Sequence, residues 1–297
     1  MTLDQLRIFI AVAEREHVTR AAEVLNLTQS ATSAAIAALE ARHAVRLFDR
    51  IGRRIVLTDA GRRFLSEARA VLARASLAER TLEDLAGLKR GILRLAASQT
   101  VATYWLPEVM QNFHRKFPDI LLTTRIGNSK QVMTALHDLQ VDIGIIEGVP
   151  SDPVLSSCAL PGDHLALVVG QKHPWVPNPP DTIEALLQSP WVLRETGSGT
   201  RDALETLLEK GGLSCADLNV AFELPANEAV CTAIEAGAGA GLLSKLVVRR
   251  SIEAGTIVAL PFKLPRRTFY LLWHHERHPT HAEKQFLEIA GCQETVS

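Results

Sequence analysis

The sequence predicts an all-α head with a small hairpin, a long connecting helix, and an α/β body of two lobes. Residues 1–90 carry 15 Lys and Arg against 11 Asp and Glu, a net charge of +4, whereas the other 207 carry 17 against 22, a net charge of −5. All 14 prolines lie at or after Pro107. Helical periodicity fills the first part, and strands alternate with helices in the second. Such a contrast predicts two modules with different partners.

Composition narrows the protein class. With 47% hydrophobic and 22% charged residues among 297, the chain has the profile of a folded globular protein. No apolar run approaches the ~18 residues of a membrane helix, and the N-terminus lacks a secretory pattern, so we expect a cytoplasmic protein without membrane contact. Cys158, Cys215, Cys231 and Cys292 form no CxxC pair, which predicts neither a disulfide framework nor a zinc ribbon.

Three helices are expected in the head. Apolar residues recur at helical spacing over residues 3–16, Thr19 is the expected N-cap of a second short helix, and Thr28 that of a third reaching about Arg42. A tight turn between two such helices is typical of a helix-turn-helix, whose second helix presents short polar side chains to DNA bases. The residues expected to do so are Thr28, Gln29, Ser30, Thr32 and Ser33.

A basic hairpin follows the third helix. Residues 47–57 predict two short strands, and Arg50, Arg53 and Arg54 cluster at the tip, where cations would contact phosphates or enter a minor groove. A solvated arginine turn is the alternative interpretation. The adjacent capped helix pair and the net positive charge favour DNA binding.

A helix from Asp59 to about Lys89 comes next. Its apolar positions step by four and three residues: Phe64, Ala68, Val71, Ala75, Ala78, Leu82 and Leu85. This heptad pattern predicts a seam that pairs with a second subunit. Packing of the helix on its own body is the alternative.

The body begins with alternating strands and helices. Strands are expected at residues 91–98, 121–126 and 141–146, in a mainly parallel sheet. Ligands of such sheets bind beyond the carboxyl ends of the strands. Side chains expected at that edge are Ser98, Gln99, Thr100, Asn128, Ser129 and Glu147.

A second lobe is expected from about residue 165. Its strand at residues 191–194 leads into a glycine-rich turn and a helix through Lys210. Backbone N–H groups and hydroxyls at a helix N-terminus favour an anion, although a flexible capped turn without a ligand would have the same sequence. The candidate residues are Thr196, Gly197, Ser198, Gly199, Thr200 and Arg201. The chain is expected to return to the first lobe near Arg266, with a strand over residues 268–273.

The segments Ala21–Ser33, Leu39–Glu40, Leu47–Arg50 and Leu57–Gly61 together resemble the LysR-type transcriptional regulators. The resemblance implies a winged helix-turn-helix domain (1–58), a linker and dimerisation helix (59–90), and an effector domain (91–297) like the periplasmic binding proteins. It places lobe I at about 91–163 and 267–297, and lobe II at about 164–266.

Membership further implies a transcriptional activator that binds double-stranded promoter DNA, forms dimers and then tetramers, contacts RNA polymerase, and has no cofactor beyond a small co-inducer. One departure concerns the third helix, in which positions 34, 35 and 37 are all alanine where relatives often carry polar groups. Base reading would then depend more on Gln29, Ser30, Thr32 and Ser33, and on DNA shape.

The effector-domain segments 98–100, 126–129, 146–148 and 194–201 resemble the sulfite-responsive and carbon-fixation subgroups of that family. The implied co-inducer is a small anion, with a sulfur oxyanion such as sulfite as one candidate. Glu147 would repel an anion, so we expect it either to accept a hydrogen bond from a protonated ligand or to hold an arginine.

Other functions have weaker support from the sequence. No nucleophile–base pair indicates a catalytic residue, and the histidines at 274, 275, 278 and 281 lack a metal-ligand spacing. Two alternatives stay open: an α/β enzyme with an appended DNA-binding head, and an architectural DNA-binding protein that senses no ligand.

Overall fold

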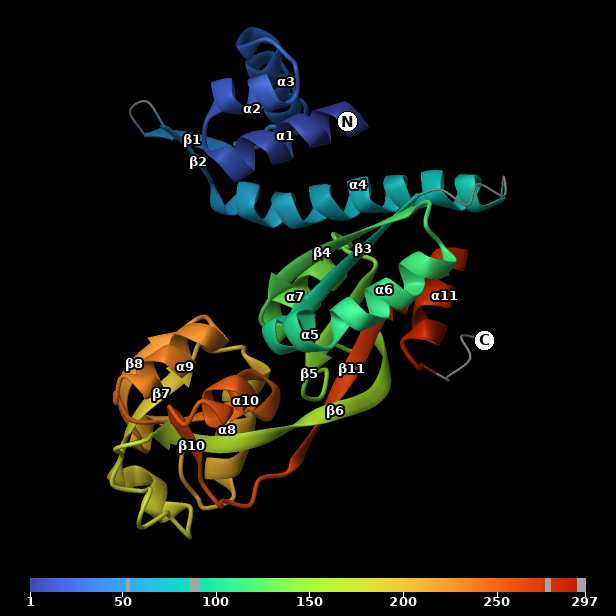
Figure 1. Ribbon diagram of the computed structural model, residues 1–297. Coiled ribbons are helices and arrows are strands. Elements are labelled where there is room, and N and C mark those ends of the chain that lie inside the picture. Colours follow the sequence, from blue (N-terminus) through green and yellow to red (C-terminus); the bar gives the residue numbers. More distant parts are fainter. Residues whose placement is uncertain (52–53, 86–90, 276–278, 293–297) are drawn as a thin grey trace. The chain divides into compact units, whose positions relative to one another are not determined.

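The computed structural model describes residues 1–51, 54–85, 91–275 and 279–292 (Figure 1). Two compact units make up the chain, the first built from the N-terminal head and the long helix and the second from the α/β body. Arg53, an expected DNA contact, lies outside the described residues. Each unit is considered by itself below.

The head contains the three expected helices, α1 (Leu3–Arg15), α2 (Val18–Val24) and α3 (Gln29–His43). The expectation that Thr19 caps α2 is wrong. The helix starts two residues earlier than that cap implies, and its N-cap is His17, whose ring nitrogen accepts a hydrogen bond from the backbone N–H of Arg20. An imidazole nitrogen is an unusual cap acceptor, which is why a hydroxyl was favoured instead.

A two-stranded antiparallel wing follows, formed by β1 (Phe48–Ile51) and β2 (Arg54–Leu57). Its entry is fixed by Glu40 of α3, whose carboxylate accepts hydrogen bonds from the backbone N–H groups of Leu47 at 2.7 Å and Phe48 at 3.1 Å. The wing is therefore held directly by the helix expected to contact DNA.

The long helix α4 (Asp59–Leu85) packs its first turns on the head. Phe9 of α1 lies between Phe48 of the wing and Phe64 of α4, with ring centroids 5.4 and 4.9 Å apart. Gly61 is required at this junction, because a Cβ there would lie 2.1 Å from the carbonyl oxygen of Leu47. These aromatic contacts join helix, wing and linker in one core.

Farther along α4, the apolar residues of the heptad pattern no longer pack in this core. Ala68 is buried with 1% exposure, whereas Val71 and Leu82 are 40% and 68% exposed. A single chain therefore leaves apolar seam positions uncovered, as the predicted pairing with a second subunit requires. Dimerisation through α4 stays a prediction.

The first lobe of the body contains three parallel strands in the order β4-β3-β5. The strands are β3 (Gly91–Ser98), β4 (Ile120–Gly127) and β5 (Ile143–Glu147). Four helices complete the lobe: α5 (Gln99–Tyr104), α6 (Leu106–Lys116), α7 (Ser129–His137) and α11 (His281–Ile289). The parallel arrangement agrees with the prediction.

The second lobe is built around strands in the order β9-β7-β8. Its strands are β7 (Pro190–Arg194), β8 (Asn219–Leu224), β9 (Ala240–Ser244) and β10 (Ile257–Ala259). Its helices are α8 (Gly199–Glu209), α9 (Asn227–Glu235) and α10 (Lys245–Glu253), with short 3₁₀ turns at Glu184–Gln188 and Cys215–Asp217. Trp191, fully buried, lies in the core of this lobe.

Two long strands pass between the lobes, β6 (Leu155–Gly170) and β11 (Arg266–His274) (Figure 1). They pair antiparallel with each other, and β6 continues into the second lobe, where it pairs with β9 and β10. The sequence did not predict the first half of β6, because polar residues, Pro161 and Gly162 interrupt its apolar pattern.

A buried arginine fastens these two strands. Arg267 of β11 donates from Nε and Nη2 to the carboxylate oxygens of Asp163 of β6, at 2.7 and 2.5 Å. Glu147, at the end of β5, lies 3.8 Å from Nη1 of the same guanidinium. Burial alone would lower the pKa of Arg267, but Glu147 and Asp163 outweigh it and raise that pKa above its ordinary value.

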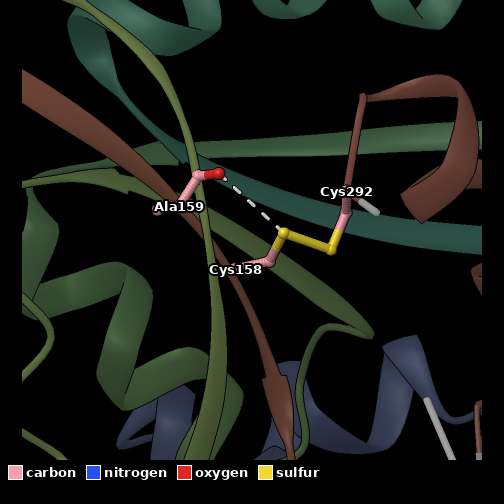
Figure 2. The surroundings of a disulfide bond; sticks show 3 residues. All are labelled: Cys158, Ala159 and Cys292. Atoms are coloured by element: carbon pink, nitrogen blue, oxygen red, sulfur yellow. Dashed lines mark hydrogen bonds between the residues drawn. A yellow bond between two sulfur atoms is a disulfide. The ribbon is translucent and has the colours of Figure 1, made fainter. Parts of the chain in front are cut away.

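A disulfide joins β6 to the end of the chain, between Cys158 and Cys292 (Figure 2). The two Cα atoms are 6.0 Å apart, within the usual range for such bonds. The expectation of four unpaired cysteines is therefore wrong for these two, while Cys215 and Cys231 are free. A separation of 134 residues gives no sequence signal of such a pair.

We expect Arg267→Gln to lower the free energy of unfolding of the body by about 3–5 kcal/mol, because it leaves two buried carboxylates without their cation. Denaturant unfolding followed by tryptophan fluorescence measures this unit alone, since all four tryptophans lie in it. Arg115→Gln, an exposed change in α6, is the control and should stay within about 0.5 kcal/mol of the parent. A loss below about 1 kcal/mol for Arg267→Gln would contradict the assigned role.

Reduction of the disulfide, or Cys292→Ser, should lower the free energy of unfolding of the body by about 2–5 kcal/mol, because the bond closes a long loop in the unfolded chain. The same fluorescence experiment with and without reductant measures the difference. Cys292→Ser should no longer respond to reductant, whereas Cys231→Ser should respond as the parent does. Equal stability of the oxidised and reduced parent would contradict the pairing.

Candidate functional site

The exposed face of α3 is narrow and weakly polar. Gln29 and Ser30 of its first turn are exposed, Ser33 is half-buried, and Ala34 and Ala37 add exposed methyl groups beyond them. The Gln29 side chain donates to the hydroxyl of Ser33 at 3.0 Å. Gln29 and Ser33 would have to break this hydrogen bond in order to contact a DNA base. The face offers three of the five polar residues expected from the sequence.

The two threonines among those five residues support the helix. The Thr28 hydroxyl caps α3 by accepting from the N–H of Ala31 at 3.2 Å. Thr32 is fully buried and donates its hydroxyl to the carbonyl of Thr28 at 3.1 Å. The expected base contact from Thr32 is therefore contradicted by its burial, whereas Thr28 is exposed and its DNA contact stays a prediction.

The wing places one described cation in solvent. Arg50 of β1 is exposed, and Arg54 follows across the hairpin, where its backbone is paired with that of Ile51. The role of Arg54 in DNA binding stays a prediction.

In the body, the expected ligand residues of the first lobe are buried where its strands end. Ser98 and Thr100, at β3 and the start of α5, are 3% and 1% exposed, and Ser129, at the start of α7, is 3% exposed. The hydroxyl oxygen of Ser98 is buried and has no hydrogen-bond partner among the described residues. A buried hydroxyl in a native protein almost always has a partner, so this atom is available to bond a ligand or a water molecule.

Asn227 of the second lobe forms hydrogen bonds with the two residues that follow Ser98 most closely, Gln99 and Thr100. Its backbone N–H donates to Gln99 Oε1 at 2.9 Å, its amide donates to the Thr100 hydroxyl at 3.2 Å, and Gln99 Nε2 donates to the carbonyl of Pro225 at 2.6 Å. Side chains of lobe I thus reach the start of α9 in lobe II. The two lobes are in contact at this place.

A second bridge lies at the start of α8. Asn128 donates to the carboxylate of Glu195 at 3.1 Å, and the N–H of Lys130 donates to the carbonyl of Gly197 at 3.1 Å. Gly199 approaches so closely that a Cβ there would lie 2.7 Å from the carbonyl oxygen of Glu147. The glycine-rich turn therefore provides close contact between lobes, in addition to any ligand contact.

Glu147 holds an arginine, the second of the two roles expected for it. Its carboxylate lies 3.8 Å from Arg267 and accepts from the Ser129 hydroxyl at 3.4 Å. Arg267 also donates to the Thr200 hydroxyl at 3.0 Å, so one guanidinium connects the ends of both lobes. Discrimination of ligand protonation by Glu147 is not required to explain its burial.

Arg201 bonds to its own lobe in this arrangement. Its guanidinium donates to Glu205 at 2.9 Å and to the carbonyl of Arg194 at 3.4 Å, and lies 3.7 Å from Glu223. These contacts lie within lobe II, and the expected place of Arg201 in an anion site stays a prediction. Of the remaining turn, Thr196 is exposed, whereas Ser198 is 3% exposed at the N-cap of α8.

Sequence reasoning missed the buried charges of this region. Arg194 donates to both carboxylate oxygens of Glu195, at 2.8 and 3.0 Å, and also to the Asn227 side chain. Together with Asp163 and Arg267, these residues form the polar interior between the lobes. The sequence pointed to one of these residues only: Arg267 follows Arg266, near which the chain was expected to return to lobe I.

The described residues contain no group of three His, Cys, Asp or Glu side chains placed to hold a metal ion. Within the same ranges, no helix has both the length and the apolar character to cross a membrane.

Known families match both units. Residues 3–62 match the bacterial regulatory helix-turn-helix family of LysR type, and residues 86–293 match the LysR substrate binding domain. The latter alone spans more than half of the chain.

Two curated relatives align over nearly the full length. An uncharacterized HTH-type transcriptional regulator, YeiE of Escherichia coli K12, is 35% identical, covering 97% of this chain and 96% of that protein. A RuBisCO operon transcriptional regulator of Allochromatium vinosum is 31% identical, covering 97% and 95%. The carbon-fixation part of the expected resemblance is thus represented among relatives, whereas the sulfite-responsive part is not confirmed.

Solved structures agree with the fold. CbnR, a LysR family regulator, complexed with its target DNA gives a TM-score of 0.70 at 23% identity, covering 98% of this chain and 99% of that one. The Synechocystis PCC6803 CcmR regulatory domain in complex with 2-PG gives 0.62 at 25% identity, covering 69% and 99%. With a helix-turn-helix head and a two-lobed α/β domain that both match, the chain belongs to the LysR family and is a ligand-responsive LysR-type transcriptional regulator.

Proposed function

We propose that this regulator senses a small anionic metabolite between the two lobes of its body and thereby changes its hold on promoter DNA. The observation that carries the proposal is the buried Ser98 hydroxyl, which lacks a partner where the lobes meet. A ligand oxygen accepting from Ser98 would satisfy it. No enzymatic turnover is proposed, because the relatives are named as regulators.

An anion also fits the donors of lobe II. Ser198 is buried at the N-cap of α8 without a side-chain capping bond, and the N-terminus of this 11-residue helix favours negative charge. Sulfite, sulfate, phosphate and anionic metabolites share this chemistry. The charge balance limits the charge of the anion, because Arg267 already pairs with two carboxylates.

Coupling to DNA follows from the contacts between lobes. Gln99 and Asn128 of lobe I bond to lobe II, so a ligand that binds between the lobes changes the free energy of this closed arrangement. A differential affinity of about 1–3 kcal/mol for one arrangement changes the equilibrium constant between the two arrangements by about 5–150-fold. The exposed seam of α4 would transmit the change to a partner subunit and its head.

The proposed assembly is a dimer through α4, and a tetramer of two such dimers. Paired heads would bind double-stranded DNA in the cytoplasm, with α3 in a major groove and the wing on phosphates. RNA polymerase is the proposed further partner for activation. Two outcomes would favour other functions: product formation from a bound metabolite for an enzyme, or no response to any small molecule for an architectural protein.

Gln29→Ala should weaken binding to a duplex selected from a randomised pool by about 1–3 kcal/mol, because a base contact is lost, and should leave binding to random DNA unchanged. Fluorescence anisotropy with both duplexes measures the difference. Arg50→Ala is the matched comparison and should weaken both complexes and reduce their salt dependence. Equal losses for Gln29→Ala on both duplexes would show that α3 does not read bases.

Ser98→Ala should weaken the binding of the effector by about 0.5–1.5 kcal/mol, the value of one neutral hydrogen bond, without destabilising the free protein. A thermal-shift panel of sulfite, sulfate, thiosulfate, phosphate, O-acetylserine and sugar phosphates identifies the ligand, and calorimetry measures its affinity. Ser157→Ala, a half-buried change in β6, should leave the affinity unchanged. An effector bound equally by Ser98→Ala and the parent would contradict the proposed site.

A further inference from the structure

A cavity of about 480 Å³ lies between the lobes, on a side that Ser98 does not reach. We name it the interlobe cavity. Its walls come from α7, the end of β5, α8 and the first residues of β11. Its volume is that of a small-molecule site. The expected ligand residues Ser129, Glu147 and Gly199 line it. The sequence therefore predicted part of its wall, but as one site together with Ser98.

The interlobe cavity runs along one face of α8. Asp202, Thr206 and Lys210 line it at a spacing of four residues, which places them in a row on the helix. With a rise of 1.5 Å per residue, the Cα atoms of Asp202 and Lys210 are separated by about 12 Å. The cavity therefore has an acidic end and a basic end.

Charges at both ends lack partners. Asp202, Lys210 and Arg266 are exposed at the opening of the cavity, and within the described ranges their side chains take part in no hydrogen bond or ion pair, so all three are accessible to a ligand. Partial burial is the first cause that raises the pKa of Asp202, and the negative charges of Glu205 and Glu147 add to it against the lowering effect of Arg201. A ligand cation would offset these negative charges.

The wall between the two ends is apolar. Side chains from both lobes and from the strands that join them contribute Met133, Ile146, Leu165, Ala203, Leu207 and Pro265. An occupant that matches the whole cavity thus has a cation, an apolar middle and an anion, in this order.

We propose that the interlobe cavity binds a short apolar peptide of about three residues, with its terminal ammonium at Asp202 and its terminal carboxylate at Lys210. Three extended residues span about 10–11 Å, close to the separation along α8. A free amino acid is too short to reach both ends. The observations behind this inference concern the interlobe cavity and do not include the Ser98 hydroxyl.

Binding in the interlobe cavity would be coupled to the Ser98 region. Ser129, Glu147 and Arg267 line the cavity, and Arg267 also bonds to Thr200 at the start of α8. Because the same buried residues form one wall of the cavity and join the lobes, a bound peptide would change the free energy of the closed arrangement. By linkage, peptide and anion would alter each other's affinity by the same factor.

The test is calorimetry on the full chain with the tripeptide Ala-Leu-Ala in three forms: free, N-acetylated and C-amidated. We expect saturable binding of the free peptide at millimolar concentration or below, and about tenfold weaker binding of each blocked form, since each loses a charge-assisted hydrogen bond. Free L-leucine should bind more weakly than the peptide.

Two variants assign the ends. In Asp202→Asn, acetylation should no longer weaken binding, and in Lys210→Gln, amidation should no longer do so. Glu209→Gln, an exposed change of the same helix outside the cavity, should behave as the parent. Failure of the free peptide to bind would overturn the proposal, as would blocked forms that bind equally well or variants that retain the parent's preference. If one variant does not fold, the other still tests its own end.

Discussion

The arrangement of the lobes depends on one buried guanidinium. Arg267 belongs to a strand that passes between the lobes, bonds to Asp163 on the other such strand, and reaches Thr200 at the start of α8 and Glu147 at the end of β5. Two buried carboxylates need a cation at this place, because an unpaired buried charge is far costlier than a paired one. Any movement of one lobe against the other must therefore preserve or rebuild these contacts.

This constraint explains how a weak ligand can have a large effect. The contacts of Gln99 and Asn128 with the second lobe are neutral or singly charged hydrogen bonds, each worth little in net free energy. The closed and open arrangements can then differ by only a few kcal/mol, which is the range in which a ligand such as the proposed anion would shift the population. The ion pair between Arg267 and Asp163 keeps the two strands together while the weaker hydrogen bonds between the lobes break and form again.

Sequence patterns predicted the elements whose stability is local. The cap at Thr28, the spacing of Phe64 and Ala68, and the strand before Ser98 were all recognised from neighbouring residues. Interactions between distant residues could not be recognised in this way. The first half of β6 is a strand because it pairs with β11, more than a hundred residues later, and Cys158 meets Cys292 for the same reason. The burial of Thr32 and the inward bonds of Arg201 likewise depend on packing that no local pattern contains.

The helix α3 exposes few polar side chains that could recognise a DNA sequence. Thr32 is buried, and Ala34 and Ala37 are exposed, so α3 keeps only Gln29, Ser30 and Ser33 as polar groups for base edges. Three short or flexible side chains supply few bidentate contacts, and the wing arginine adds affinity without sequence information. In the proposed dimer, the spacing of two heads and the deformability of the DNA between them would then contribute much of the selectivity. Such a dimer would be well suited to control by a ligand, because a change in the relative position of its two heads would alter the main source of its sequence selectivity.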